Sequence, residues 1–521
     1  MATTETPQGV APTQGVVPHR AVITVCAMIA TLMQALDSTI ANVALPYMQG
    51  SLSATSDQIT WVLTSYIVAA AIMTAPVGWL SARFGRKPLF VTCLVGFTVT
   101  SMLCGVAQSL NEMVAFRLLQ GMFGAALVPL SQSTMLDIYP PEQRGSAMAL
   151  WGVGVMVGPI LGPTLGGYLT DLYNWRWVFY VNLPFGVLGT VGLILCLPKS
   201  EARAGMRFDS LGFGVLALGV GAFQLMLDRG QDQDWFGSRE IIIEAVLAGL
   251  GLYLFVVHLM TAEKPFLSPR LFRDRNLSAS LVMMFSIGMI LLASSALLAP
   301  WLQTLAGYPV ATAGLVLAPR GFGTMAAMMV SGRLSGKVDP RLLMALGCAL
   351  LSYSLWTMTG WTPDVSRTTI VVNTMFQGAG LGFVFMPLQL VAFATLPAEL
   401  RTDATSLLSL LRNVGSAVGV SVCSALLAHN GQVVHSELAA GITPFNPALH
   451  GVGAVQMLAP ATAGGAALLD RMVNQQVAII AYMDDFKAML VISAPAILLL
   501  LLMRKPAALA KPDPEHGAAL D

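Results

Sequence analysis

Long apolar runs separated by short polar breaks are the feature that most limits how this chain can fold. Runs of about 20 residues, the length an α-helix needs to cross a bilayer, recur fourteen times. Their approximate limits are 21–46, 58–80, 88–107, 112–137, 145–169, 177–197, 209–228, 239–260, 277–304, 310–332, 342–361, 368–395, 402–428 and 487–504. Only 11% of the residues are charged and the mean hydropathy is +0.70, whereas soluble domains are about a quarter charged. The sequence therefore predicts an all-α polytopic membrane protein with fourteen transmembrane helices.

Basic residues are distributed unevenly between the two sets of loops. An even number of spans puts both termini on one side, and with the N-terminus inside, 19 of the 28 Lys and Arg residues fall in inner loops and tails. The positive-inside rule then predicts cytoplasmic termini in a plasma membrane. The expected divisions are a tail over 1–20, a six-helix bundle over 21–200, two inserted helices over 201–262, a second six-helix bundle over 263–505 with an outer loop at 430–486, and a tail over 506–521.

The chain also repeats itself at a fixed distance. Three groups of residues recur 257 positions later: Gln120-Gly121 as Gln377-Gly378, Pro140, Glu142 and Arg144 as Pro397, Glu399 and Arg401, and Gly158 and Gly162 as Gly415 and Gly419. Two six-span halves with two spans inserted between them are the expected architecture. Parallel halves around a binding site near the bilayer midplane are typical of secondary transporters.

Glycines line one face of the fifth span. The four that form this ridge are Gly154, Gly158, Gly162 and Gly166. Residues four apart share a helix face, so another helix can approach the ridge closely. Pro159 and Pro163 remove backbone donors and are expected to bend the helix. The pattern indicates a conformational hinge, and the alternative is an ordinary packing seam of small residues.

Several chemistries have no sequence signature here. Gly336-Lys337 is followed by Val338 and lacks the glycine spacing of a nucleotide-binding loop. Neither a catalytic Ser/His/Asp set nor metal-spaced His or Cys residues is present, and the six cysteines lie within apolar runs. A net charge of +1 indicates no nucleic-acid partner. We therefore expect no enzyme activity, catalytic residue, metal or cofactor.

Motifs in five consecutive regions carry a family resemblance. They are Leu36–Pro46 (LDSTIANVALP), Gly78–Lys87 (GWLSARFGRK), Arg117–Ala125 (RLLQGMFGA), Gly154–Gly167 and Trp175–Gly186, with Leu227–Gly230 and Thr443–Pro447 as further matches. Together they resemble the major facilitator superfamily, specifically its fourteen-span drug:proton antiporter branch. The resemblance implies the major facilitator fold, a proton gradient as the energy source, and export of drugs across the inner membrane of a bacterium. One departure is Ala82, which stands where the family usually has an acidic residue that is thought to form a charge relay.

Two of the charged residues that fall inside spans, where charge is unfavourable and usually functional, lie at similar depths. Asp37 in the first span and Arg117 in the fourth both lie roughly 9–14 Å from the outer end, at 1.5 Å per residue. The two side chains could therefore meet, and only Asp37 can exchange a proton because arginine stays charged. Proton coupling is the favoured interpretation, mostly because of the resemblance. The alternative is a structural ion pair that joins the two spans.

Polar residues in these two spans and in later ones are candidates for a substrate cavity. The predicted lining residues are Gln34, Gln120, Arg320, Gln377 and Gln389. Arg320 either faces the cavity and binds an anionic or carbonyl-bearing substrate, or pairs with groups of the bundle itself. The favoured function is export of small apolar or amphiphilic molecules from the cytoplasm or the membrane lipid. The alternatives are an exporter specialised for fatty acids or other carboxylates, and a membrane receptor or assembly subunit that has lost transport.

The outer segment from about Asn430 to Asp485 is unusually long for a connection, which is normally a sign of function or disorder. Its part from Ala466 to Met483 alternates apolar and polar residues as an amphipathic surface helix does. In relatives from bacteria with two membranes, the resemblance implies a periplasmic adaptor and an outer-membrane channel as partners. We therefore expect this segment either to dock the adaptor or to form a lid on the transporter's own outer face.

Overall fold

The computed structural model describes residues 19–199, 202, 205, 207–263, 265–335, 337–443, 463–493 and 495–503. The N-terminal half comprises α1 (Arg20–Ser51), α2 (Ser56–Ile59), α3 (Trp61–Thr74), α4 (Val77–Phe84), α5 (Arg86–Val106), α6 (Leu110–Gly124), α7 (Leu127–Ile138), α8 (Arg144–Leu172), α9 (Trp177–Tyr180) and α10 (Asn182–Cys196). Then follow α11 (Ser210–Arg229) and α12 (Arg239–Thr261). The C-terminal half comprises α13 (Arg270–Arg273), α14 (Arg275–Pro300), a π-helical turn (Trp301–Leu305), α15 (Val310–Leu334), α16 (Pro340–Met358), α17 (Arg367–Phe393), α18 (Arg401–Ala440), α20 (Ala463–Ser493) and α21 (Pro495–Leu502).

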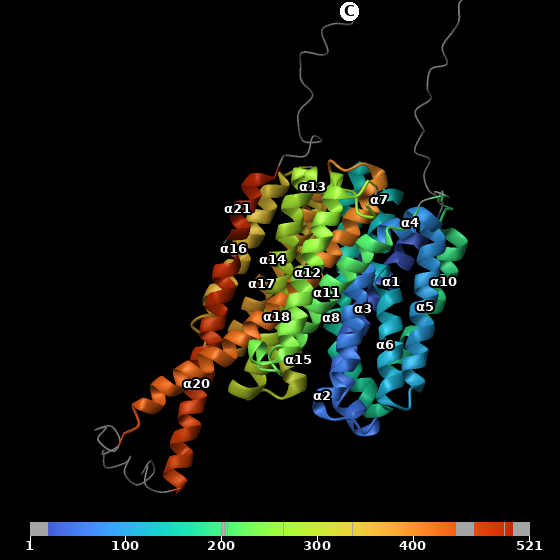
Figure 1. Ribbon diagram of the computed structural model, residues 1–521. Helices are drawn as coiled ribbons and strands as arrows, with labels where there is room; N and C mark the ends of the chain where they lie inside the picture. The colour runs from blue at the N-terminus through green and yellow to red at the C-terminus, as the bar shows by residue number, and fades with distance from the viewer. Residues whose placement is uncertain are drawn as a thin grey trace, which may run out of the picture.

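The two halves stand side by side, and α11 and α12 lie at the junction between them (Figure 1). Within the described residues, twelve helical segments are long and apolar enough to cross a membrane, or thirteen if α3 and α4, bent by 58°, count as one span. These segments correspond to the first thirteen expected spans. The all-α architecture is confirmed, whereas the fourteenth crossing, expected within α20 and α21, stays a prediction.

The internal repeat is visible in how the helices pack. In the N-terminal half α1 packs along α8, and in the C-terminal half α14 packs along α18. Gly158 of α8 lies against Ala35 and Leu36 of α1, and its repeat mate Gly415 of α18 lies against the backbone of Phe285 of α14. Glycines at matching positions therefore permit the same close helix pair in both halves.

The inserted pair α11–α12 is tied to the chain that leads into the C-terminal half. Asp209 caps α11 by accepting a hydrogen bond from the backbone N–H of Gly212 at 2.9 Å, and it contacts His258 Nε2 of α12 at 2.8 Å. The backbone N–H of Phe266 donates a third bond at 3.3 Å. Burial alone would raise the pKa of Asp209, but these hydrogen bonds hold it below its usual range. One carboxylate thus joins three segments of the chain.

The segment expected as an outer loop is partly helical, which corrects the sequence interpretation. α18 continues to Ala440 and α20 begins at Ala463, so residues 430–440 and 463–486 extend the last two long helices. Both helices project beyond the other helices at the end opposite α21 (Figure 1). The amphipathic stretch 466–483 is therefore part of α20 rather than a separate surface helix. Thr443–Pro447 falls largely outside the described residues.

Candidate functional site: a buried ion pair on a glycine-packed helix

Asp37 of α1 and Arg117 of α6 form an ion pair inside the N-terminal half. Arg117 Nη1 lies 2.7 Å from Asp37 Oδ2, and neither side chain is exposed at all, at 0% each. Arg117 also donates from Nη1 to Gln120 Oε1 at 2.9 Å and from Nε to the carbonyl of Val62 at 3.1 Å. The structure therefore brings together the two charged residues that depth along the helices predicts to meet.

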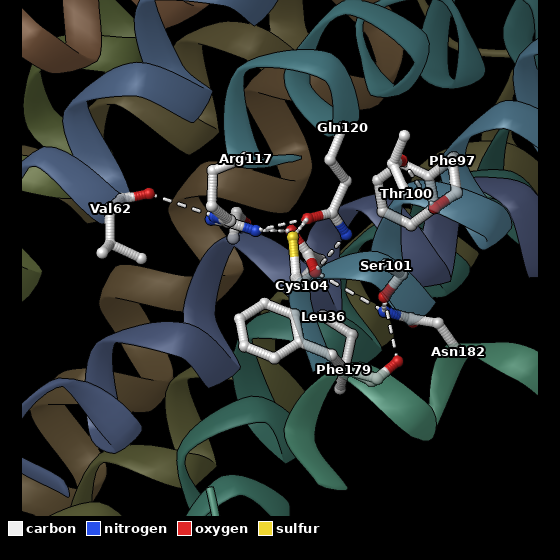
Figure 2. A network of polar contacts seen from close by, with 12 residues as sticks. Leu36, Val62, Phe97, Thr100, Ser101, Cys104, Arg117, Gln120, Phe179 and Asn182 are labelled. Carbon is white, nitrogen blue, oxygen red and sulfur yellow. Dashed lines mark hydrogen bonds and ion pairs between the residues drawn. The ribbon is translucent and has the colours of Figure 1, made fainter. Parts of the chain in front are cut away.

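The second carboxylate oxygen of Asp37 is bound by amides. Gln120 Nε2 donates to Asp37 Oδ1 at 2.9 Å, and Asn182 Nδ2 lies 3.5 Å from the same oxygen. Asn182 also donates to Ser101 Oγ at 3.0 Å, and Ser101 donates to the carbonyl of Phe179 at 2.9 Å. Figure 2 shows this network converging from α5, α6 and α10 onto α1. Both carboxylate oxygens of Asp37 therefore have hydrogen-bond donors.

Aromatic rings complete the surroundings of Arg117. Its guanidinium carbon lies 4.2 Å from the centre of the Tyr66 ring and 5.7 Å from that of Phe179. Cation–π contact of this kind stabilises a cation out of water by about 1–2 kcal/mol. If Asp37 took up a proton, Arg117 would lose its ionic partner and keep only dipoles and rings around it.

Three members of this network escaped the sequence interpretation: Tyr66, Ser101 and Asn182. Ser101 and Tyr66 are uncharged side chains in apolar helices, and nothing in the sequence distinguishes them from packing residues. Asn182 could have been found, because it belongs to the motif Trp175–Gly186. A carboxamide there, at the start of α10, is well placed to reach the first span.

The glycine ridge of α8 faces the helix that carries Asp37. A Cβ added to Gly158 would lie 2.6 Å from the Cβ of Ala35 and 2.8 Å from the backbone N of Leu36, much closer than real side chains approach. The other three ridge glycines, Gly154, Gly162 and Gly166, lie against Met28, Thr39 and Ile40 of α1. The ridge therefore allows α8 to contact α1 immediately beside the acid. The bend expected at Pro159 and Pro163 stays a prediction, as does the hinge role.

The opposite face of α8 packs on α15 of the other half. Gly145 and Gly152 lie against Ser335 and Met328, and Gly332 of α15 lies against Ala149. α8 is thus held between the helix with the acid and the opposing half.

The glutamines predicted to line a cavity are dispersed. Gln120 belongs to the ion-pair network, and Gln34 of α1 is half-buried. Gln389 of α17 hydrogen-bonds Gln132 of α7, its repeat mate 257 residues earlier. Gln377 is fully buried, and neither polar atom of its amide has a hydrogen-bond partner among the described residues. Gln34 and Gln120 belong to the N-terminal half and Gln377 and Gln389 to the C-terminal half, and their role in a substrate cavity stays a prediction.

Arg320 of α15 binds groups of α14. Its Nη1 donates to Ser295 Oγ at 2.7 Å, and its Nη2 donates to Ser294 Oγ at 2.8 Å and to the carbonyl of Leu291 at 3.1 Å. No ion pair with an acid is found for Arg320 in the described part of the chain. This geometry matches the pairing within the bundle that the sequence left open, and it leaves the positive charge without a neutralising carboxylate.

The halves also contact each other at the end where α1 begins and α21 ends. Asp137 of α7 forms an ion pair with Arg401 of α18, whose Nη1 lies 2.9 Å from Asp137 Oδ1. It forms a second ion pair with Arg86 of α5. The carboxylate of Asp403 lies directly over Gly78 at the start of α4. Ala82 supplies no acid here, and Asp137 pairs with Arg86 instead. These contacts join the two halves at this end.

A family model and whole-chain comparisons agree with this geometry. The model described as Major Facilitator Superfamily matches residues 27–420. The chain belongs to the major facilitator superfamily. The resemblance inferred from the motifs is confirmed, and with it the major facilitator fold.

Individual members of the superfamily are similar over most of their length. The chain is 36% identical to the multidrug export protein EmrB of Escherichia coli (strain K12) over 428 residues, 82% of this chain and 84% of the relative. It is 36% identical over 429 residues to the fatty acid resistance protein FarB of Neisseria gonorrhoeae, 82% of this chain and 85% of the relative. The human organic anion transporter MFSD10 has the same fold, with a TM-score of 0.56 at 14% identity over 93% of this chain and 100% of its own. The chain is accordingly a multi-pass membrane transporter of the major facilitator type.

Proposed function

We propose that this transporter is a proton-coupled antiporter that exports drugs and other apolar or amphiphilic compounds across a bacterial inner membrane. The observation that carries the proposal is the buried pair of a protonatable acid, Asp37, and a fixed cation, Arg117 of α6, in which the acid lies on the helix that packs against the glycine ridge of α8. Similarity to EmrB and to the probable multidrug resistance protein EmrY supports the substrate class. The positive-inside distribution of basic residues supports cytoplasmic termini.

The coupling step follows from the geometry. With Asp37 charged, Arg117 is neutralised and α1 and α6 are held together. A proton on Asp37 removes the charge and weakens that bond, so α1 becomes free to shift against Gly158 and α8. Release of the proton on the other side restores the pair. Substrate export is driven if substrate and proton favour opposite arrangements.

The experiment that tests the proposal is efflux from proteoliposomes with an imposed proton gradient. A panel of cationic, neutral and anionic amphiphiles is loaded, and uphill movement is followed with and without an ionophore that collapses the gradient. Gradient-dependent efflux of several unlike compounds is the expected result. Transport that ignores the gradient for every compound would contradict the proposal.

A second candidate substrate class is carboxylates, including fatty acids. Arg320 carries a half-buried positive charge whose described partners are hydroxyls and one carbonyl, so an anionic group could bind there without displacing an acid. Similarity to the fatty acid resistance protein FarB points in the same direction.

Arg320→Ala tests this alternative. Efflux of anionic substrates is expected to fall roughly ten- to a hundredfold, in line with the loss of about 1.5–3 kcal/mol for a hydrogen bond to a charged group, while cationic substrates change little. Ser295→Ala, which removes one partner and keeps the cation, is the matched control. An equal loss for substrates of every charge would assign Arg320 a purely structural role.

We further propose that the projecting ends of α18 and α20 dock a periplasmic adaptor that leads to an outer-membrane channel. α18 is 40 residues long, about twice what a bilayer needs, and it extends beyond the bundle together with α20 (Figure 1). The alternative is a cover over the transporter's own outer face. Replacing residues 440–470 by a short Gly/Ser linker should abolish co-purification with an adaptor and spare proton-driven transport in liposomes. Loss of transport with adaptor binding intact would favour the cover.

A further inference from the structure

Asp485 of α20 is a buried acid outside the Asp37 network. Its side chain is 0% exposed, and in the described part of the chain neither carboxylate oxygen has a hydrogen-bond partner. Asp37, equally buried, has a guanidinium and two amides around its oxygens. An ionised carboxylate without partners is strongly unfavourable away from water, so Asp485 is the neutral acid in this arrangement.

The elements packed against α20 supply no compensating charge. α20 packs on α18, α16 and α14, and on the π-helical turn and α21. On α14 the only charged residue is Arg275, at the far end of the helix. On α16 the titratable groups are Arg341, Cys348 and Tyr353. α21 and the π-helical turn contain no titratable group. On α18, Cys423 lies near the carboxyl, Arg412 lies eleven residues before Cys423 and His429 six residues after it. On α20 itself, Tyr482 is near, and Asp484 forms an ion pair with Lys487 at 2.8 Å.

Asp485 lies at about the same level along its half as the Asp37 network does in the N-terminal half. α20 packs on α14 as α10 packs on α1. In the N-terminal half, Gly192 of α10 lies against Cys26 of α1. The repeat counterpart of Cys26, 257 residues later, is Met283 of α14. Met283 lines a small cavity together with Ser493 of α20, so Ser493 lies at about the level of Gly192. Asn182 precedes Gly192 by ten residues and Asp485 precedes Ser493 by eight. Asp485 therefore occupies about the level in the C-terminal half at which Asn182 meets Asp37 in the N-terminal half.

A second small cavity lies about one helical turn from Asp485 along α20. It is lined by residues of three helices, among them Ala293 of α14, Cys423 of α18 and Met489 of α20. Met489 follows Asp485 by four residues and so lies on the same face of the helix. The space is of a size that holds about one water molecule. A small shift of α18 against α20 would be enough to bring water to the acid.

We propose that Asp485 is a second proton carrier of the transport cycle, protonated in the arrangement described here and deprotonated when α18 and α20 separate. In that step the O–H bond of the carboxylic acid breaks, the bonding pair stays on the carboxylate and the proton passes to water. Reprotonation from water reverses it. The inference rests on the proposed proton-coupled antiport, and it adds a carboxyl in the half that lacks the Asp37–Arg117 pair.

Infrared spectroscopy of the purified protein tests the protonation state without requiring transport. The wild type should show a carbonyl stretch of a protonated, water-excluded carboxylic acid, and Asp485→Asn should remove it. Asp484→Asn, which changes the neighbouring acid that pairs with Lys487, is the matched control and should leave it in place. A band unchanged in Asp485→Asn would overturn the proposal, even if the protein proved not to be driven by protons at all.

Transport stoichiometry tests whether the proton is exchanged. With a monovalent cationic dye in proteoliposomes, Asp485→Asn should lower the proton-to-substrate ratio by one. At an imposed gradient of one pH unit the limiting accumulation should then fall about tenfold. Loss of the infrared band with an unchanged ratio would show a permanently protonated acid and overturn the carrier role. If Asp485→Asn does not fold, Asp485→Glu serves instead: a displaced band with the ratio retained supports the proposal, and an undisplaced band refutes it.

Discussion

The two halves share a scaffold but differ in charge at matching positions. At the repeat offset of 257, Asp37, Arg117 and Gln120 correspond to Ser294, Thr374 and Gln377. The N-terminal set is ionic and joined by hydrogen bonds, whereas Gln377 is buried without a partner among the described residues. The glycine contacts of α8 on α1 and of α18 on α14 are alike in both halves. Close helix packing is thus common to the repeat, while the ionic chemistry at this position belongs to one half.

The largest expected effect on transport comes from the charged pair of the N-terminal half. Asp37→Asn should abolish uphill efflux, because it removes the titratable group of the pair and leaves Arg117 buried without its counter-charge. Truncating one partner of a buried pair destabilises by about 3–5 kcal/mol, so the thermal midpoint should fall as well. The measurement is gradient-driven dye efflux, with downhill exchange as the test of residual binding. With a cationic dye, which does not use the Arg320 group, Ser294→Ala at the matching position is the control and should retain most activity. Full gradient-driven transport by Asp37→Asn would remove Asp37 from the coupling mechanism.

A smaller effect should come from the packing that both halves share. Gly158→Leu would place a side chain into the backbone of Ala35 and Leu36, so a folded but inactive protein is expected. Gly415→Leu should behave similarly if both close helix pairs move during transport. Gly214→Leu on α11 is the control, because no atom lies within 4 Å of a Cβ at that position. Size-exclusion chromatography establishes folding before transport is assayed. Normal transport by Gly158→Leu would reduce the ridge to simple packing.

The smallest effect concerns the inserted helices, which belong to neither half. Asp209→Ala removes hydrogen bonds to Gly212, His258 and Phe266 and should destabilise the protein by about 1–2 kcal/mol. Since folding lowers the pKa of Asp209, its contribution is present above the ordinary aspartate value of about 3.9 and is lost as the pH falls through the lower folded-state value. Thermal unfolding from pH 7 to pH 3 should therefore show a difference that narrows on acidification. Glu263→Gln in the same connection is the control. A difference that widened at low pH would contradict the assignment.

Hydropathy and spacing predicted much of this architecture from the sequence. The apolar runs located thirteen helical segments, and the depths of Asp37 and Arg117 along their helices predicted the pair, because charges inside spans are rare and must find one another. The outer ends of α18 and α20 were missed since their mixed polarity resembles a loop to any count of apolar residues. Asp485 was missed for the same reason, as it fell in that expected loop. Ser101 and Tyr66 carry no charge, and only the fold shows that they face the network.

The hydrogen bond between Gln132 and Gln389 joins two residues that are the same position of the repeat. Two identical half-length chains related by a two-fold axis would make that contact with themselves, as subunits do at an isologous dimer interface. In such a dimer every substitution appears twice, so an acid gained at one site is gained at both. Joining the halves in one chain removes this constraint. A fused gene can keep a carboxylate at Asp37 and a hydroxyl at Ser294, and so assign separate tasks to positions that began as copies.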